Sequence, residues 1–193
     1  MDAPVTDADA RPTGRHDVMS ALKQAALELL AEQGMAFSIR EVAGRANVNH
    51  GLVHRHFGSK QELVTAAIAD RTRELSGLIA EGTTSPIDAG SHGQPPTAVL
   101  LAHLILNDAT SLIGTPLASH AVVDLAGPHV SARDPLTAAH RAALANAISL
   151  GWTVFGAYSL DAAGAAPSAE VHAKLRNIIS ELLGTDNSQP DPT

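Results

Sequence analysis

The stretch SIREVAGRANVNHGLVHRHFGSK, residues 38–60, indicates two short helices joined by a tight turn, followed by the start of a third helix. Ser38 precedes Glu41 by three residues, which is the spacing of a capping box at a helix N-terminus. Phe37 and Val42 have the spacing of a hydrophobic staple across the same cap. The sequence therefore predicts that a helix begins directly after Ser38.

The second helix follows the turn Asn47-Val48-Asn49, in which Asn49 is placed to cap it. Val53 and Phe57 lie one turn apart and predict a buried face. The other faces carry His50, Gly51, His54 and Arg55. A short helix with an apolar back and a cationic, hydrogen-bonding front suits insertion into a DNA major groove.

The series Val48-x-x-Gly51-x-x-His54-x-His56-Phe57-x-x-Lys60 ends in a second capping box, from Ser59 to Glu62. With that box, the region of about residues 16–80 resembles the DNA-binding domain of the tetracycline-repressor (TetR) family. His54 stands where members typically have Tyr, and Arg55 replaces an aromatic or polar residue. The resemblance implies an all-α protein, in which a helix-turn-helix head precedes a helical body that binds ligands and dimerises.

Contacts to DNA are expected from both short helices. Arg40 and Ser38 lie at a helix N-terminus, where phosphate commonly binds, and this favours DNA contact by Arg40; the alternative is a capping Ser beside a solvated Arg. Arg55 could pair with guanine edges, and Leu52 could meet a thymine methyl or pack in the core. His56 could instead make a hydrogen bond at the end of its own helix. Gly51 could simply be a residue that is unfavourable within a helix. The predicted DNA-binding residues are Ser38, Arg40, Asn49, His50, Gly51, Leu52, His54, Arg55, His56 and Lys60.

The charge is distributed unevenly along the chain, whose formal net charge is −7. Residues 11–60 carry seven Lys and Arg against four acidic residues, whereas residues 61–193 carry six against thirteen. A basic head on an acidic body is typical of a DNA-reading module attached to a separate regulatory domain.

We expect a disordered arm at residues 1–14, a helix-turn-helix domain at 15–60, a connecting helix at 59–81, and a regulatory and dimerisation domain at 82–193. Residues 82–96 are rich in Gly, Pro and Ser and predict a loop or mobile linker. Apolar periodicity and capping signals predict helices at 16–33, 39–45, 50–57, 59–80, 97–113, 116–126, 135–160 and 168–183, with Pro167 at the start of the last and a polar tail after it.

Residues 142–160 contain no charged residue, yet Asn146, Ser149 and Thr153 make a membrane span improbable. Such a helix is buried in its own domain or at a subunit interface. In the TetR family the last two long helices of each subunit form a four-helix bundle in the dimer. The resemblance thus implies a homodimer, with a candidate interface at Ala143, Ala147, Gly151, Leu175, Ile178, Ile179 and Leu182.

A few polar and aromatic residues on otherwise apolar helices are candidates for an effector pocket, because polar groups on apolar walls orient ligands. The alternative is that they belong to the core or the dimer interface. The ligand-binding candidates are His103, Asn107, Trp152, Phe155 and Tyr158.

Other chemistry has little support in the sequence. There is no cysteine, nucleophile elbow or phosphate loop, so we expect neither an enzyme nor a cofactor. His50 and His54, with His56 nearby, have a spacing that could hold a metal, but they coincide with the groove-facing surface. The pairs His103 with Asn107 and His120 with Asp124 are weaker metal candidates. No signal peptide is recognised, and we expect a cytoplasmic protein.

These observations predict a transcriptional regulator that binds a palindromic operator in double-stranded DNA, most simply a repressor released by a small-molecule effector. Two alternatives stay open. One is a helical small-molecule-binding protein or enzyme with a vestigial DNA-binding head, and the other is a metal-responsive regulator.

Overall fold

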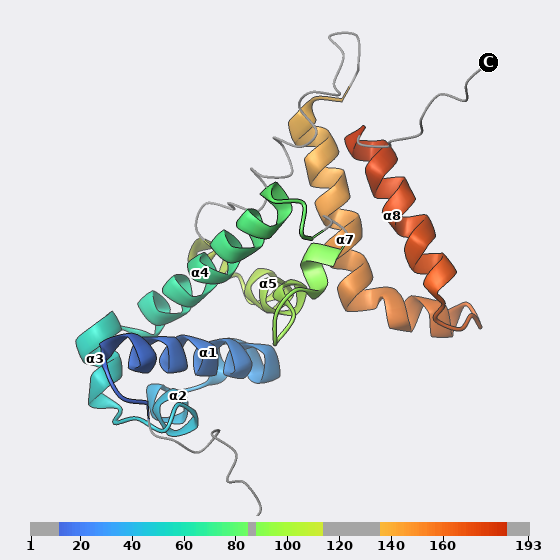
Figure 1. Ribbon diagram of the computed structural model, residues 1–193. Coiled ribbons are helices and arrows are strands. Elements are labelled where there is room, and N and C mark those ends of the chain that lie inside the picture. The colour runs from blue at the N-terminus through green and yellow to red at the C-terminus, as the bar shows by residue number, and fades with distance from the viewer. Residues whose placement is uncertain (1–11, 85–87, 114–135, 185–193) are drawn as a thin grey trace, which may run out of the picture.

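The computed structural model describes residues 12–84, 88–113 and 136–184, and all regular structure within them is helical (Figure 1). The prediction of an all-α protein is therefore confirmed. The predicted helix at 116–126 lies outside the described residues, as do most of the N-terminal arm and the C-terminal tail. The helices are α1 (Arg15–Gln33), α2 (Ile39–Arg45), α3 (Gly51–Phe57), α4 (Lys60–Ala80), α5 (Thr97–Leu106), α7 (Ala138–Ala162) and α8 (Ala169–Leu183), with 3-10 turns η2 (Gly34–Ala36), η3 (Asp88–Ser91) and η4 (Thr110–Leu112).

The predicted caps of the head form largely as expected. Ser38 Oγ accepts from the Glu41 N–H at 3.3 Å, and the Glu41 carboxylate accepts from the Ser38 N–H at 2.7 Å. The Ser38 hydroxyl also donates to that carboxylate at 2.7 Å, and the bonds from the Ser38 hydroxyl and the Ser38 N–H lower the pKa of Glu41. The predicted cap at Asn49 also forms, because its Oδ1 accepts from the Gly51 N–H at 2.8 Å.

The second predicted capping box is only half formed. Ser59 Oγ accepts from the Glu62 N–H at 3.1 Å. The Glu62 carboxylate, however, accepts from the Ser59 hydroxyl at 2.9 Å, while the Ser59 N–H donates to the Phe57 carbonyl. The cap still fixes the start of α4 at Lys60.

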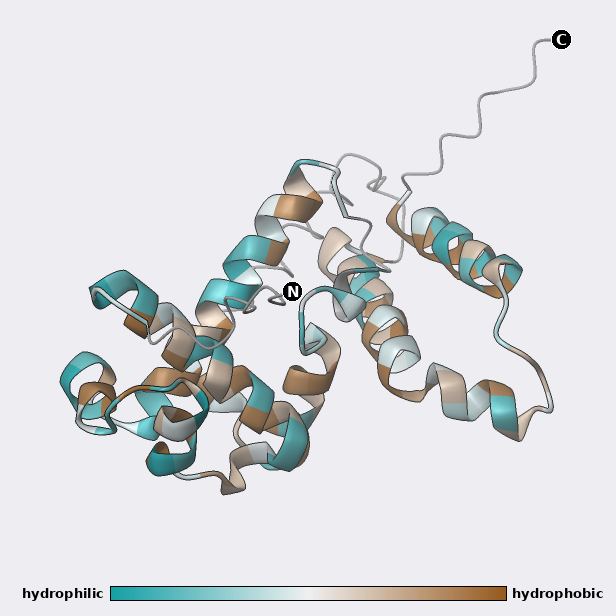
Figure 2. Cartoon of the chain, turned by 60° about the horizontal axis from the view of Figure 1, so that its bottom comes forward, coloured by the Kyte–Doolittle hydropathy of each residue, from teal (hydrophilic) through white to brown (hydrophobic). Residues whose placement is uncertain are grey.

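The core of the head lies where α1 crosses α4, with α2 and α3 packed below them (Figures 1 and 2). The apolar face predicted for α1 is buried as expected. Lys23 and Asp70 form an ion pair between α1 and α4, and Arg73 also donates to Asp70. Burial alone would raise the pKa of Asp70, but the bonds from Lys23 and Arg73 lower it overall. The largest fully buried core residues are Leu22, Leu30, Phe37, Val42, Val53, Leu63, Val64, Ile68, Leu100 and Leu104.

The helix α5 connects the head to the rest of the chain through its packing. Leu100 and Leu104 are 0% exposed and belong to the core of the head. The end of α4 instead joins a second core, formed with α7 and α8. The helix α4 therefore takes part in both cores, and α5, which follows residue 82 in the chain, contributes to the core of the head. The second core consists of Leu75, Ile79, Ala142, Ala145, Ile179 and Leu183.

Three predicted helix boundaries were wrong. The helix predicted at 97–113 ends at Leu106, because the Asn107 side chain donates to the His103 carbonyl at 2.7 Å and Asp108 takes a φ of 55°. The helix predicted from 135 begins at Ala138, where Thr137 forms a capping box with His140. The last helix begins at Ala169 rather than at Pro167, because Ser168 caps it.

Within the described ranges, no helix is both long enough and apolar enough to cross a membrane. The helix α7, which includes the uncharged residues 142–160, lies beside α8 and against α5 instead (Figure 1).

Candidate nucleic-acid interface

The short helix α3 lies at one end of the molecule and packs against α4 (Figure 1). Val53 is 0% exposed, and Leu52 and Phe57 are partly buried against the core of the head. Gly51, His54 and Arg55 are exposed on the other faces. The helix thus has the predicted buried apolar face and exposed polar face. Leu52 packs against the core, which was the alternative to a contact with a thymine methyl.

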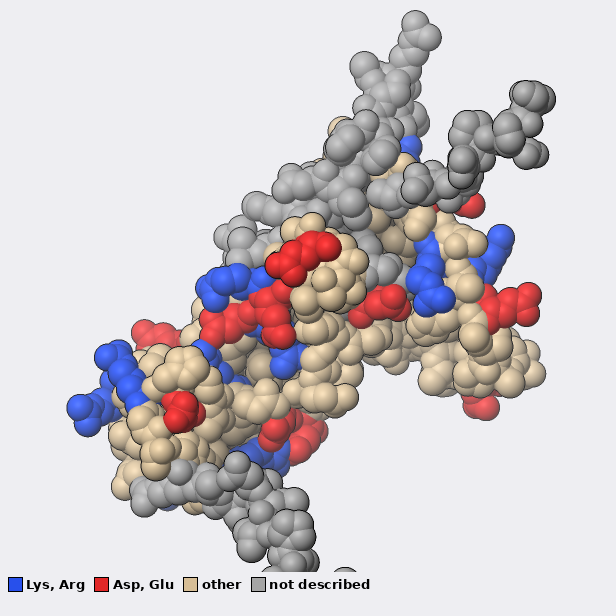
Figure 3. Space-filling model, in the orientation of Figure 1, with Lys and Arg blue, Asp and Glu red and all other residues tan. Residues whose placement is uncertain are grey.

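Two arginines near this surface have no hydrogen bond or ion pair to any described residue. Arg40 lies in the first turn of α2, and Arg55 lies on α3; both are exposed. Lys and Arg side chains project from this end of the molecule (Figure 3). Their charge is available to a polyanion, which is what contact with DNA phosphates and base edges requires.

Arg45 on α2 is used differently. Its guanidinium donates to both carboxylate oxygens of Glu32 on α1, at 2.5 and 2.8 Å. This pair raises the pKa of Arg45 and lowers that of Glu32. A bidentate pair fixes direction as well as distance, so Arg45 orients α2 on α1.

The histidines of this region have different surroundings. His54 Nδ1 lies 3.0 Å from the Gly58 carbonyl, so the ring closes the C-terminal end of its own helix. A helix-end hydrogen bond was the alternative considered for His56, and it is made by His54 instead. His50 is exposed and His56 is half-buried, and neither imidazole ring has a hydrogen bond to a described residue.

An open cleft of about 440 Å³ separates α3 from the beginning of α1. Arg55 and His56 line it from α3, and Gly14 and Arg15 from α1. The sequence interpretation missed Gly14 and Arg15, although a basic residue at the start of a helix is a signal for anion contact. The cleft thus gathers three basic side chains around one opening.

Lys60 was predicted to bind phosphate, and its ammonium group is engaged within the head. It donates to the carbonyls of Met35 and Phe37, at 2.8 and 2.9 Å, and lies 5.1 Å from the centre of the Phe37 ring. These contacts fasten the start of α4 to the segment that precedes α2. A lysine ammonium has three donors, so a phosphate contact would add to this structural role.

Ser38, Asn49 and Gly51 also have local roles. The side chains of Ser38 and Asn49 make the caps described above. A Cβ at position 51 would lie 3.3 Å from Asn49 Oδ1, so glycine suits the tight start of α3.

The structure does not bring the five ligand-binding candidates together. His103 and Asn107 lie beside Gly34, where an added Cβ would be 3.4 Å from each side chain. Trp152 makes an edge-on contact with His172, with ring centres 6.2 Å apart. Tyr158 is 74% exposed. A ligand-binding role for each of these five residues therefore stays a prediction, because helical spacing alone does not reveal which neighbour a residue faces.

Phe155 does line an apolar groove of about 190 Å³ between α5 and α7. No charged side chain lines this groove. The other residues of this groove were not predicted as ligand-binding residues, because in the sequence they resemble ordinary core residues. The lining residues are Ala98, Leu101, Ala102, Ile105, Leu106, Leu150, Gly151, Val154 and Phe155.

The residues predicted for a dimer interface fall into two groups. Ile179 is 1% exposed within the second core, so it packs inside its own subunit. Ala143, Ala147 and Ile178 are exposed, and Gly151, Leu175 and Leu182 are partly exposed. The exposed apolar face of α7, here called the α7 stripe, consists of Leu144, Ala147, Phe155 and Tyr158.

No group of three or more His, Cys, Asp or Glu residues that could hold a metal occurs in the described parts of the chain. His120 and Asp124, which were suggested as a pair, lie outside those parts.

Comparison with known proteins gives a family match in the head. The family model for bacterial regulatory proteins of the TetR family matches residues 22–67. The chain is 49% identical over 77 residues to the HTH-type transcriptional repressor Rv3405c of Mycobacterium tuberculosis, covering 39% of this chain and 41% of that protein. It is 32% identical over 82 residues to the HTH-type transcriptional regulator BetI of Rhizobium meliloti, covering 42% of this chain and 38% of that protein. The match spans about two fifths of the length of these relatives.

The solved structure of Salmonella enterica GusR is similar over 91% of this chain and 100% of its own, with a TM-score of 0.64 and 15% identity. At that identity the likeness concerns the fold, and it extends through the body as well as the head.

Proposed function

We propose that this chain, whose residues 22–67 form a helix-turn-helix domain of the TetR family, regulates transcription by binding a palindromic operator as a homodimer. The observation that carries the proposal is the exposed side of α3, where Arg55 has no partner among the described residues while Val53 anchors the helix in the core. The simplest output is repression that an effector relieves.

In the proposed complex the two α3 helices of the dimer enter successive major grooves, about 34–36 Å apart. Arg55 reads a guanine through its bidentate fork, and His50 contacts a neighbouring base or phosphate. Arg40 and the cleft formed by Arg15 and His56 take backbone phosphates. Lys60 holds α4 against the turn before α2, which keeps these groups in one arrangement.

An effector would lie in the groove between α5 and α7. The lining is apolar, so the expected ligand is a small apolar or amphipathic molecule. To release DNA it must bind the two conformations of the dimer with different affinities.

The dimer is proposed to form through α7 and α8, and an arginine at position 147 tests it. Ala147 is exposed in the α7 stripe, so Ala147→Arg would bury an unpaired charge in the interface. We expect the dimer dissociation constant to rise about thirtyfold or more. Ala80→Arg, at an exposed position on α4, is the control. Sedimentation of both variants at wild-type mass, twice 19.9 kDa, would refute this interface.

The regulatory function is tested by selecting random double-stranded DNA with the purified protein at near-physiological salt. We expect an enriched palindrome, because a symmetric dimer reads two related half-sites. A failed selection is repeated with ligand-rich cell extract, since a corepressor would restore enrichment. Absence of enrichment in both selections would refute the proposal and favour the alternative of a vestigial head.

A further inference from the structure

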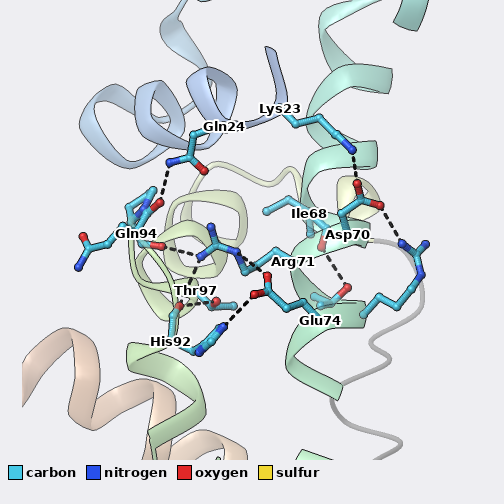
Figure 4. A network of polar contacts seen from close by, with 12 residues as sticks. Lys23, Gln24, Ile68, Asp70, Arg71, Glu74, His92, Gln94 and Thr97 are labelled. Carbon is cyan, nitrogen blue, oxygen red and sulfur yellow. Dashed lines mark hydrogen bonds and ion pairs between the residues drawn. The ribbon is translucent and has the colours of Figure 1, made fainter. Parts of the chain in front are cut away.

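A buried arginine joins the head to the segment that precedes α5. Arg71 on α4 is 8% exposed, and its Nη1 donates to the Pro95 carbonyl at 3.0 Å and to the His92 carbonyl at 3.4 Å (Figure 4). A guanidinium is costly to bury unless its donors are satisfied. The carbonyls of His92 and Pro95 provide acceptors for Nη1, and both belong to residues 92–97, here called the Arg71 turn.

The Arg71 turn is shaped around the guanidinium. Gly93 has a φ of +85°, and a Cβ at this position would lie 1.5 Å from Arg71 Nη1. Any other residue would therefore displace the arginine as well as strain the backbone. The hydroxyl and the N–H of Thr97 also donate to the His92 carbonyl, at 2.9 and 3.1 Å, so the first residue of α5 is part of the same arrangement.

Two further contacts hold the turn from outside. The Glu74 carboxylate lies 3.4 Å from His92 Nε2 and 3.9 Å from Arg71 Nε. Gln24 on α1 donates to the Gln94 carbonyl at 2.8 Å. The turn is thus attached to α4 and to α1, which are the two long helices of the head.

The position of the turn decides the position of α5. One face of α5 places Leu100 and Leu104 in the core of the head, while Leu101 and Ile105 line the groove against α7. A shift of the first turn of α5 along α4 would therefore change the packing of the head and of the groove together. Packed cores respond to such shifts by repacking rather than by stretching.

We propose that Arg71 is a positioning residue for operator recognition: by fixing the Arg71 turn and α5 on α4, it sets the distance between the two α3 helices of the dimer. The inference rests on the proposed function. It assigns the spacing of half-sites to a contact outside the DNA-binding surface, whereas the sequence of each half-site is read by α3.

The test compares Arg71→Gln and Gly93→Ala with the control Arg73→Gln. Arg73 is exposed two residues further along α4, so its replacement removes the same charge without touching the turn. Each protein is presented with the selected half-sites separated by spacers of different length. We expect wild type and Arg73→Gln to prefer one spacer. In the two turn variants this preference should fall about threefold to thirtyfold, with base preference within each half-site unchanged.

Circular dichroism and thermal unfolding show which variants are folded. Folded Arg71→Gln or Gly93→Ala protein that keeps the wild-type spacer preference would overturn the inference, because Arg71 would then contribute only stability. If both variants fail to fold, Gln24→Ala is used for the test. It removes one exposed hydrogen bond to the Arg71 turn and should weaken the spacer preference by a smaller factor. A wild-type protein that selects no palindrome either alone or with cell extract would refute the proposed function itself.

Discussion

Replacement of Phe37 by alanine is expected to lower the free energy of unfolding by about 3–5 kcal/mol, the usual cost of truncating a fully buried aromatic side chain. Phe37 is 1% exposed in the core of the head. The substitution also removes the ring beside the Lys60 ammonium, 5.1 Å away, and so loosens the start of α4. Because natural domains are stable by only about 5–15 kcal/mol, this loss is a large fraction of the free energy of unfolding. Urea denaturation followed by circular dichroism measures the change.

The matched control for Phe37→Ala is Leu106→Ala, which truncates a large apolar side chain that is 79% exposed. We expect its effect to stay within about 0.5 kcal/mol. A loss below about 1 kcal/mol for Phe37→Ala would contradict the position of this ring in the core. If Phe37→Ala is unfolded throughout, Phe37→Leu provides a measurable intermediate, because it keeps most of the apolar volume.

The second large effect concerns DNA recognition. Arg55→Ala is expected to weaken operator binding by about 1–3 kcal/mol, or roughly fivefold to 150-fold, and to relax the preference at one base pair of each half-site. The reason is that Arg55 is exposed on α3 and has no partner within the described parts of the chain, so nothing in the head competes for its guanidinium. Titration of operator and scrambled DNA at one salt concentration measures both quantities.

Two further variants separate charge from recognition at position 55. Arg73→Gln removes an arginine of the same charge from an exposed position on α4, outside the proposed dimer helices, and should leave operator binding unchanged. Arg55→Lys keeps the charge but loses the planar fork, so it should retain affinity for scrambled DNA while losing discrimination. Equal discrimination between operator and scrambled DNA in wild type and Arg55→Ala would refute the base-reading role.

The sequence by itself determined the local architecture of the head. The caps at Ser38, Asn49 and Ser59 join residues only two or three positions apart, so their spacing alone predicts the bonds. The apolar faces of α1, α2 and α3 follow from helical periodicity for the same reason. The bounds of α2 were correct, and those of α3 and α4 were correct to within one residue.

The tertiary structure decided which partner each apolar face and each charged group meets. The sequence predicted a largely apolar helix at α5 and an apolar stripe on α8, but it could not show that Leu104 packs in the head or Ile179 within its own subunit. Likewise, Lys60 reaches carbonyls 23 and 25 positions earlier in the chain.

Arg71 shows the same limit most clearly. It meets carbonyls 21 and 24 positions later, in a segment that the sequence presents only as a loop or mobile linker. Helical spacing constrains neighbours within about one turn, whereas contacts across the fold depend on how whole helices cross. The sequence therefore predicted a surface that reads DNA, and only the folded chain showed how that surface is held relative to the groove between α5 and α7.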